Sequence, residues 1–208
     1  MRVAVIGSSG SGKSTFGHRL SAACDLARIE LDALNWAPNW TDRTTHDPAE
    51  FERLVDQAIA APRWVTDGNY RAAMVRTLPK ATHLVWLDYD RSVVMRRVIW
   101  RSFIRAAGRQ ELWPGTGNRE DFRRWLDKEH PIRWAWDTYN RRRAQYEVLF
   151  AEPRMAAVAK HRLRHPRQAK PLVAQLAADA QFECTQYRVA NSTIEGSFIF
   201  DDNREPLG

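Results

Sequence analysis

The chain has 208 residues, of which 44% are hydrophobic and 27% charged, and its formal net charge is +7 at pH 7. Such a chain can build a core, which excludes a disordered polyelectrolyte, and its length favours one domain with at most a small appendage. No apolar run approaches the ~18 residues of a membrane span, and the N-terminus lacks a signal-peptide pattern. Two cysteines are too few for a disulfide framework. We therefore expect a cytoplasmic protein without membrane contacts.

Short apolar runs alternate with helical periodicities through residues 1–176. The runs predict strands at 3–6, 27–31, 64–66, 83–87 and 160–163. The periodicities predict helices at 13–23, 48–61, from 90 to a glycine-rich loop at 108–117, and at 120–150 and 166–176. Because strands separated by helices pair in parallel, we expect an α/β fold with a five-stranded parallel sheet flanked by helices.

Residues 177–208 differ in character from the rest. They contain six acidic residues and two arginines, a local charge of −4, so that residues 1–176 carry +11. Tyr187, Val189, Phe198 and Phe200 alternate with other residues on either side of Asn191. We expect this acidic extension to be either a hairpin or unstructured, since a lone hairpin is marginal without a surface to pack on.

A glycine-rich turn joins the first predicted strand to the first predicted helix. Its sequence, Gly7-Ser8-Ser9-Gly10-Ser11-Gly12-Lys13-Ser14, fits the pattern G-x-x-x-x-G-K-[ST]. In this pattern backbone N–H groups point at a polyphosphate, the lysine adds positive charge beside the β- and γ-phosphates, and the hydroxyl group of Ser14 binds Mg²⁺. The sequence therefore predicts a binding site for ATP and Mg²⁺ over residues 7–15, with Thr15 at its end.

A phosphate-binding loop is compatible with several activities. A GTPase would carry N-K-x-D to read guanine, and this tetrapeptide is absent from the sequence. Helicase-type and related ATPases need a longer chain. The length therefore favours a compact kinase.

Acidic residues follow three predicted strands, at the edge where ligands collect in open α/β sheets. Asp32 ends the second strand and Asp67 the third. Each is a candidate for holding Mg²⁺ or orienting an attacking hydroxyl group, with capping of a turn or helix as the alternative. Asp88 ends the fourth strand and precedes a helix, so we weigh helix capping equally for it.

Two segments resemble parts of adenylate kinases. Asp67-Gly68-Asn69-Tyr70-Arg71 is similar to the D-G-F-P-R that ends their third strand, where the arginine grips the phosphate of the acceptor nucleotide. Asp88 followed by Arg97 and Arg101 resembles the helix whose two arginines reach the triphosphate. This chain has Asn-Tyr where the first motif has Phe-Pro, so the acceptor need not be the same.

A fuller resemblance, over residues 1–176, is to the DNA topology modulation proteins, which are small adenylate-kinase-like P-loop proteins. It rests on residues 7–14, 31–36, 64–70, 111–113 and 118–120. What it implies is a P-loop NTPase fold of the nucleoside monophosphate kinase type, with a helical lid. The acidic extension lies outside it.

Thirteen arginines lie between Arg91 and Arg143. Phosphoryl transfer needs positive charge around the moving group more than covalent help from the protein. Arg97 and Arg101 share one helix face, and the glycine-rich loop before the next helix suits a hinge, so we expect a lid at about 105–143 that closes over ATP. Arg97, Arg101 and Arg71 are the arginines expected at phosphates, and most others are expected on solvated faces.

Five of the nine tryptophans fall between Trp100 and Trp136. We expect Trp125, Trp134 and Trp136 to anchor the lid helices to the body rather than to stack nucleic-acid bases. Trp36 and Trp40 follow Asp32, in the region expected to shape the acceptor pocket. They either stack on a planar substrate or pack within the protein.

The sequence thus favours an ATP- and Mg²⁺-dependent kinase acting on a small molecule, with a nucleoside monophosphate as one candidate acceptor. The candidate catalytic residues are Lys13, Asp32, Asp67, Arg97 and Arg101, and those expected to bind the acceptor are Asp32, Trp36, Asp67 and Arg71. One alternative is a nucleotide-regulated DNA-binding protein, which the basic body suits although no DNA-reading motif is visible. Another is an ATP-binding module with slow hydrolysis.

Overall fold

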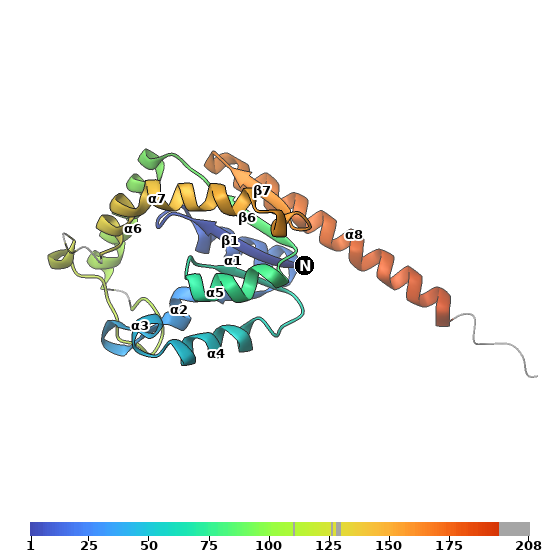
Figure 1. Ribbon diagram of the computed structural model, residues 1–208, viewed down its shortest axis with the longest axis horizontal. Coiled ribbons are helices and arrows are strands. Elements are labelled where there is room, and N and C mark those ends of the chain that lie inside the picture. The colour runs from blue at the N-terminus through green and yellow to red at the C-terminus, as the bar shows by residue number, and fades with distance from the viewer. Residues whose placement is uncertain (110, 126, 128–129, 196–208) are drawn as a thin grey trace, which may run out of the picture.

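The computed structural model describes residues 1–109, 111–125, 127 and 130–195. Five parallel strands form its central sheet, and their order across the sheet is β2 (Ala27–Glu30), β5 (Trp64–Asp67), β1 (Arg2–Gly7), β6 (His83–Leu87) and β7 (Ala159–Leu163). Figure 1 shows this sheet between helices. All five predicted strands are confirmed, with ends within about one residue of the expected ones. Because β1 is central, the loop after it lies in the middle of the sheet's carboxyl edge.

The sheet is buried on both faces, as continuous apolar runs predict. Alternate residues of a strand point to opposite faces. Accordingly Val3 and Val5 of β1 belong to one core cluster, with Val65 and Val85 of the neighbouring strands. Ala4 and Ile6 belong to the other cluster, whose largest members are Trp64, Trp86 and Phe51.

Helices cover both faces of the sheet. On one side lie α1 (Lys13–Cys24) and α8 (Ala169–Glu195), which pack against each other. On the other side lie α4 (Pro48–Ala58), α5 (Arg71–Thr77) and the second half of α7 (Pro131–Ala151), while α6 (Arg91–Gly108) packs along α7.

Shorter elements connect these helices and strands. After β2 come the helices α2 (Leu31–Asn35) and α3 (Arg43–His46), and between them the antiparallel strands β3 (Trp36–Ala37) and β4 (Thr41–Asp42). Single 3₁₀ turns occupy Pro38–Trp40, Leu78–Lys80, Phe122–Arg124, Pro153–Met155 and Pro166–Gln168.

The helix predicted at 120–150 starts too early, and residues 126, 128 and 129 of the predicted range lie outside the described residues. The helix α7 begins at Pro131, where His130 Nδ1 accepts a hydrogen bond from the Ile132 amide and proline fills the first helical position. Before it, Glu111 and Arg119 form an antiparallel bridge around two glycines in left-handed conformations. We call residues 109–130, between α6 and α7, the lid segment.

The C-terminal helix is longer than predicted. Where we expected a hairpin or unstructured chain from residue 177, α8 continues to Glu195. Leu172, Leu176 and Ala180, each four residues apart, are buried against the sheet and α1. The buried face of the helix therefore continues beyond residue 176, where the predicted helix ended. The second arm of the expected hairpin, with Phe198 and Phe200, lies outside the described residues. Within the residues that the structure describes, none of the helices combines the length and apolar surface needed to cross a bilayer.

Candidate active site

The loop between β1 and α1 is wound so tightly that glycine is required in it. Gly10 has φ +82°, and a Cβ atom placed there would lie 2.8 Å from Cβ of Val98 and 2.9 Å from the carbonyl oxygen of Val94. Gly12 also has a left-handed backbone, with φ +98°. The turn is closed by a hydrogen bond from the Ser11 amide to the Ser8 carbonyl oxygen, 3.1 Å. Residues 8–12 therefore form a cradle packed directly on α6.

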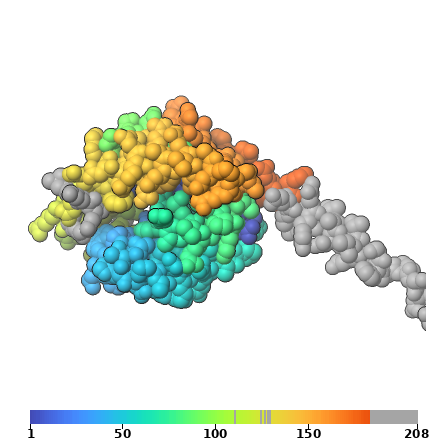
Figure 2. Space-filling model, in the orientation of Figure 1, coloured from blue at the N-terminus to red at the C-terminus, as the bar shows by residue number. Residues whose placement is uncertain are grey.

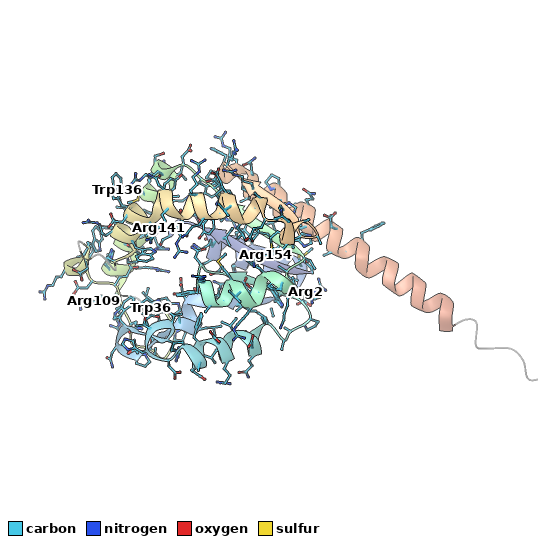
Figure 3. The ribbon with its side chains drawn as sticks, in the orientation of Figure 1. Arg2, Trp36, Arg109, Trp136, Arg141 and Arg154 are labelled. Atoms are coloured by element: carbon cyan, nitrogen blue, oxygen red, sulfur yellow. The ribbon has the colours of Figure 1, made fainter. Side chains whose placement is uncertain are left out.

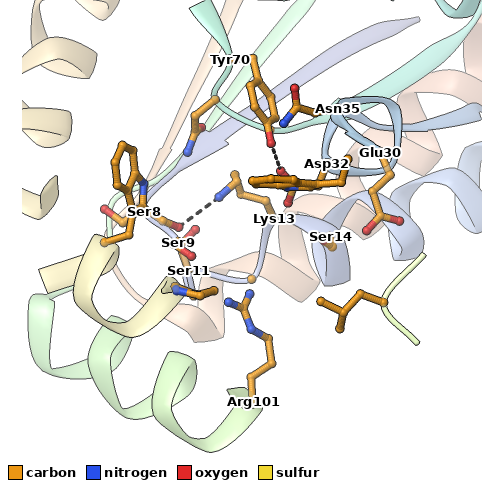
Figure 4. Close-up of a pocket in the computed structure, with 18 of the residues that line it drawn as sticks. Ser8, Ser9, Ser11, Lys13, Ser14, Glu30, Asp32, Asn35, Tyr70 and Arg101 are labelled. Atoms are coloured by element: carbon orange, nitrogen blue, oxygen red, sulfur yellow. Dashed lines mark hydrogen bonds between the residues drawn. The ribbon is translucent and has the colours of Figure 1, made fainter. Parts of the chain in front are cut away.

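Lys13 reaches back over this cradle. Its Nζ donates to the carbonyl oxygens of Gly7 (3.0 Å) and Ser8 (3.1 Å), and Figure 4 shows the second of these bonds. Burial lowers the pKa of the amine to about 8, although the negative charges of Asp32 and Asp67 act to raise it. A cation held in a confined place beside backbone amides is the arrangement that binds a polyphosphate.

Both predicted arginines of α6 face the cradle. Arg97 Nη1 donates to the Ser11 carbonyl oxygen over 3.0 Å, and its guanidinium lies 5.4 Å from the ring centre of Tyr89. Arg101, one turn further along, is directed at the same loop in Figure 4, and burial lowers the pKa of its guanidinium. Its Nε finds no hydrogen-bond partner among the described residues. Lys13, Arg97 and Arg101 thus converge on one place, as the sequence predicted.

Ser14 and Asp67 meet at the rear of the cradle. Ser14 Oγ lies 3.4 Å from Asp67 Oδ1, and Asp67 Oδ2 makes no hydrogen bond within the described part of the chain but lies 3.7 Å from Arg28 Nη2. Burial, followed by the nearby charge of Glu30, raises the pKa of Asp67 to about 6. A hydroxyl oxygen beside a carboxylate is a donor set that suits Mg²⁺, so these two residues fit the predicted metal.

The cradle opens into a cleft of about 1780 Å³. In Figure 2 the surface is hollowed between α7, in yellow, and the blue and green segments that follow β2. Asp32, Trp36 and Arg71 line this cleft together with residues 8–15, Arg97 and Arg101. Gly7 and Asp67 lie just behind its wall. The predicted site residues are therefore gathered around one space.

Asp32 does not end a strand as predicted. The strand β2 stops at Glu30, and Asp32 lies in the first turn of α2. Its Oδ1 accepts a hydrogen bond of 2.8 Å from the hydroxyl group of Tyr70. Tyr70 was not among the predicted site residues. Arg71 begins α5 on the exposed rim of the cleft.

Asp88 does not cap the helix that follows it. It is buried, and its carboxylate binds Arg143 (2.9 Å) and Arg162 (2.6 Å). Arg143 is therefore part of a structural ion-pair network, whereas Arg142 beside it faces the cleft and donates to the Asn69 carbonyl oxygen over 3.1 Å. Adjacent residues of a helix point to different sides, so the sequence alone does not separate the roles of these two arginines.

The tryptophans of the lid region are placed differently from the prediction. Trp134 and Trp136 are 42% and 54% exposed, so they do not anchor the lid to the body. Trp125 contacts Phe122 and His130 within the lid segment itself. Trp36 and Trp40 pack on Trp113 of the lid segment, with ring centres 6.2 and 6.0 Å away, and Figure 3 shows Trp36 at the edge of the opening.

Asn118 fastens the lid segment to the residues after Trp36. Although buried, its side chain accepts from the Trp40 amide (2.9 Å) and donates to the Ala37 carbonyl oxygen (2.9 Å). No sequence signal could have paired residues some eighty positions apart.

We expect Asn118→Ala to open the lid segment. The change leaves two backbone groups without their partner, at about 1–3 kcal/mol each, so hydrogen exchange of the 111–119 amides should speed up by about tenfold or more. Asp121→Ala, in the same segment but accepting from the Arg123 amide within its own turn, is the control. Equal exchange in wild type and Asn118→Ala would show that Asn118 does not hold the lid.

Comparisons with known proteins address the fold. No family model matches the chain, and no curated protein matches its sequence. A shikimate kinase from Acinetobacter baumannii, solved in complex with shikimate, is similar with a TM-score of 0.52 at 14% identity, covering 91% of this chain and 93% of that one. A gluconokinase from Sinorhizobium meliloti 1021 is similar with a TM-score of 0.45 at 20% identity, covering 88% and 96%. The similarity to the shikimate kinase structure shows a shared fold and confirms the predicted α/β fold with a parallel five-stranded sheet.

Proposed function

We propose that this protein is a P-loop kinase that transfers the γ-phosphoryl group of Mg-ATP to a small-molecule acceptor. One observation carries the proposal. The cradle, with Lys13, Arg97 and Arg101 turned toward it, opens into the same cleft as Asp32, Trp36 and Arg71. A nucleotide and an acceptor therefore have room to meet at a concentration of positive charge.

Each element of the cradle has a separate task in this reaction. Backbone amides of residues 8–14 hold the β- and γ-phosphates, and Lys13 lies beside them. Arg97 and Arg101 neutralise charge that spreads over the transferred group, which is the main help a protein gives to phosphoryl transfer. Ser14, with Asp67 behind it, would hold Mg²⁺, which supplies further charge neutralisation. Arg71 is placed to contact an anionic group of the acceptor at the rim.

A nucleotide-regulated DNA-binding protein, which the resemblance to the DNA topology modulation proteins would suit, is the second candidate. Against it, Arg97, Arg101 and Arg142 face the cleft, while Arg143 and Arg162 bind buried Asp88. These five arginines thus give duplex DNA no continuous basic surface. Duplex binding that weakens steeply with salt would favour the second candidate.

The kinase proposal is tested by measuring ADP release from Mg-ATP in the presence of nucleoside monophosphates and small hydroxyl compounds. Stimulation by any acceptor, with the phosphorylated product identified by mass, would support it. Binding of Mg-ATP with hydrolysis that no acceptor stimulates would favour the slow ATPase.

The pH dependence of activity should reflect two groups of the cradle. Asp67 must be ionised, and its pKa of about 6 means that kcat/KM for Mg-ATP rises as the pH increases through 6. Lys13 must be charged, and its pKa of about 8 means that kcat/KM falls above pH 8. We expect a bell-shaped profile with limbs at these values, measured by initial rates between pH 5 and 10. Asp67→Asn should lose the acidic limb, and an acidic limb that stays unchanged in this variant would show that another group causes it.

A further inference from the structure

The acceptor side of the cleft carries an oriented carboxylate close to the cradle. Asp32 Oδ1 accepts the Tyr70 hydroxyl hydrogen bond of 2.8 Å, and the charge of Asp32 is felt at Lys13. Figure 4 shows Asp32 between Tyr70 and Lys13. Burial and the neighbouring Asp32 charge raise the pKa of the Tyr70 phenol far above its usual range, so this group remains a donor at all physiological pH values. The carboxylate is thus held in one orientation, facing the place where an acceptor would react.

This carboxylate distinguishes between two kinds of acceptor. A phosphate acceptor, as in a nucleoside monophosphate, would bring its own negative charge toward Asp32, and two like charges at close range disfavour each other. A hydroxyl acceptor is neutral and must lose a proton when it is phosphorylated. A fixed carboxylate next to the transferred group serves the second chemistry and hinders the first.

One buried amide oxygen beside the cradle makes no hydrogen bond with the protein. Within the described chain this oxygen, Asn69 Oδ1, has no hydrogen-bond partner. Asn69 lines the cleft and is fixed there because its Nδ2 donates to the Gly7 carbonyl oxygen over 2.6 Å. A hydroxyl group of a ligand can donate a hydrogen bond to this oxygen.

Trp36 gives the same space an aromatic wall. One face of its ring stacks on Trp113 with 18° between the planes, and Trp40 meets it edge-on at 5.6 Å. Its position is therefore fixed by other rings, while it still borders the cleft. Small-molecule sites combine such apolar surface with a few placed polar groups. A ligand ring with carbon–hydrogen groups on its face can pack on the Trp36 ring, while hydroxyl groups at its edge hydrogen-bond to Asn69.

We propose that the acceptor is a small polyhydroxylated ring compound phosphorylated on a hydroxyl group, with Asp32 taking up the proton. The inference rests on the proposed kinase function. As the bond from the acceptor oxygen to Pγ forms and the bond from Pγ to the β-phosphate oxygen breaks, the hydroxyl proton passes to Asp32. ADP leaves with the electron pair of the broken bond, and Asp32 later releases the proton to solvent.

The first test compares two sets of acceptors with Mg-ATP. One set contains glucose, gluconate, shikimate and myo-inositol, and the other AMP, CMP, GMP and UMP. We expect at least one hydroxyl compound, and no nucleotide, to raise ADP release about tenfold or more over hydrolysis. Stimulation by a nucleoside monophosphate alone, or by neither set, would overturn the acceptor class. If Mg-ATP itself fails to bind, the proposed function fails instead.

The second test needs no known acceptor, because water can take the acceptor's place. Asp32→Asn keeps an oxygen for Tyr70 but removes the base, so kcat for Mg-ATP hydrolysis should fall about 10²-fold or more with an unchanged KM for ATP. Asp56→Asn, which makes the same chemical change on α4 at a residue that pairs with Arg76 and does not line the cleft, should hydrolyse ATP like wild type. Unchanged hydrolysis by Asp32→Asn, or an equal loss in both variants, would contradict the role of Asp32. A raised KM for ATP with unchanged kcat would place Asp32 in nucleotide binding instead.

Discussion

Replacing Lys13 with alanine should abolish phosphoryl transfer while leaving the fold intact. We expect kcat/KM for Mg-ATP to fall by about 10³-fold or more, since one preorganised donor to the transition state is commonly worth 10²–10³ and Lys13 also binds the ground-state phosphates. In the free protein its Nζ is bonded to two loop carbonyl oxygens and buried near Arg101 and Arg142. We therefore expect loss of the amine to impair nucleotide binding and phosphoryl transfer rather than folding.

The same variant should unfold at no lower temperature than wild type. The pKa of Lys13 is about 8 in the folded protein against 10.5 for an ordinary lysine, so the unfolded chain binds this proton more tightly. Below pH 8 protonation then favours unfolding, and removal of the amine removes this cost. Lys170→Ala, on an exposed position of α8, is the control and should keep full activity. Full turnover in Lys13→Ala would refute the assignment of the cradle.

Removing either of the two α6 arginines should give the second-largest loss. Arg97→Ala and Arg101→Ala are each expected to lower kcat by about 10²–10³-fold, the usual effect of deleting one charge-stabilising group. Arg101 is the clearer case, because burial and the neighbouring Arg105 already lower the pKa of its guanidinium. Its removal should not lower the melting temperature of the free protein.

Arg96→Ala provides a matched control on the same helix. Arg96 precedes Arg97 but is exposed, so its loss should change kcat by less than about twofold. Initial rates at saturating Mg-ATP, with melting temperatures for each variant, make the comparison. If Arg96→Ala and Arg101→Ala lost activity equally, the direction in which the α6 arginines point would not matter. That result would contradict the proposal that Arg97 and Arg101 act because they face the cradle.

The cradle could be predicted from sequence because its determinants are contiguous. Gly10, Gly12 and Lys13 lie within four residues, between a strand and a helix that each have a clear local signal. The five strands and their parallel pairing were predictable from apolar runs separated by helices, whereas their order across the sheet came only with the structure. Arg97 and Arg101 were predictable for a similar reason, since their spacing places them on one helix face.

The acceptor side could not be predicted, because its contacts join distant segments. Tyr70 orients Asp32 across 38 positions, and Asn118 reaches Trp40 across 78. Local patterns also misjudged the lid segment, where periodicity from residue 120 suggested helix although Asp121 caps a single 3₁₀ turn at Phe122–Arg124 and α7 begins only at Pro131. Asp88 was a plausible cap on local grounds, and only the fold brings Arg143 and Arg162 to it.

The central claim is that residues 8–14 wrap a polyphosphate on which Lys13, Arg97 and Arg101 converge. A crystal structure of the protein with Mg²⁺ and a non-hydrolysable ATP analogue tests it most directly. We expect β- and γ-phosphate oxygens about 3 Å from the loop amides. Lys13 Nζ should move from the Gly7 and Ser8 carbonyl oxygens onto the phosphates, and the guanidinium groups of Arg97 and Arg101 should contact the γ-phosphate. Phosphates bound elsewhere, or both arginines turned to solvent with the analogue in place, would contradict it.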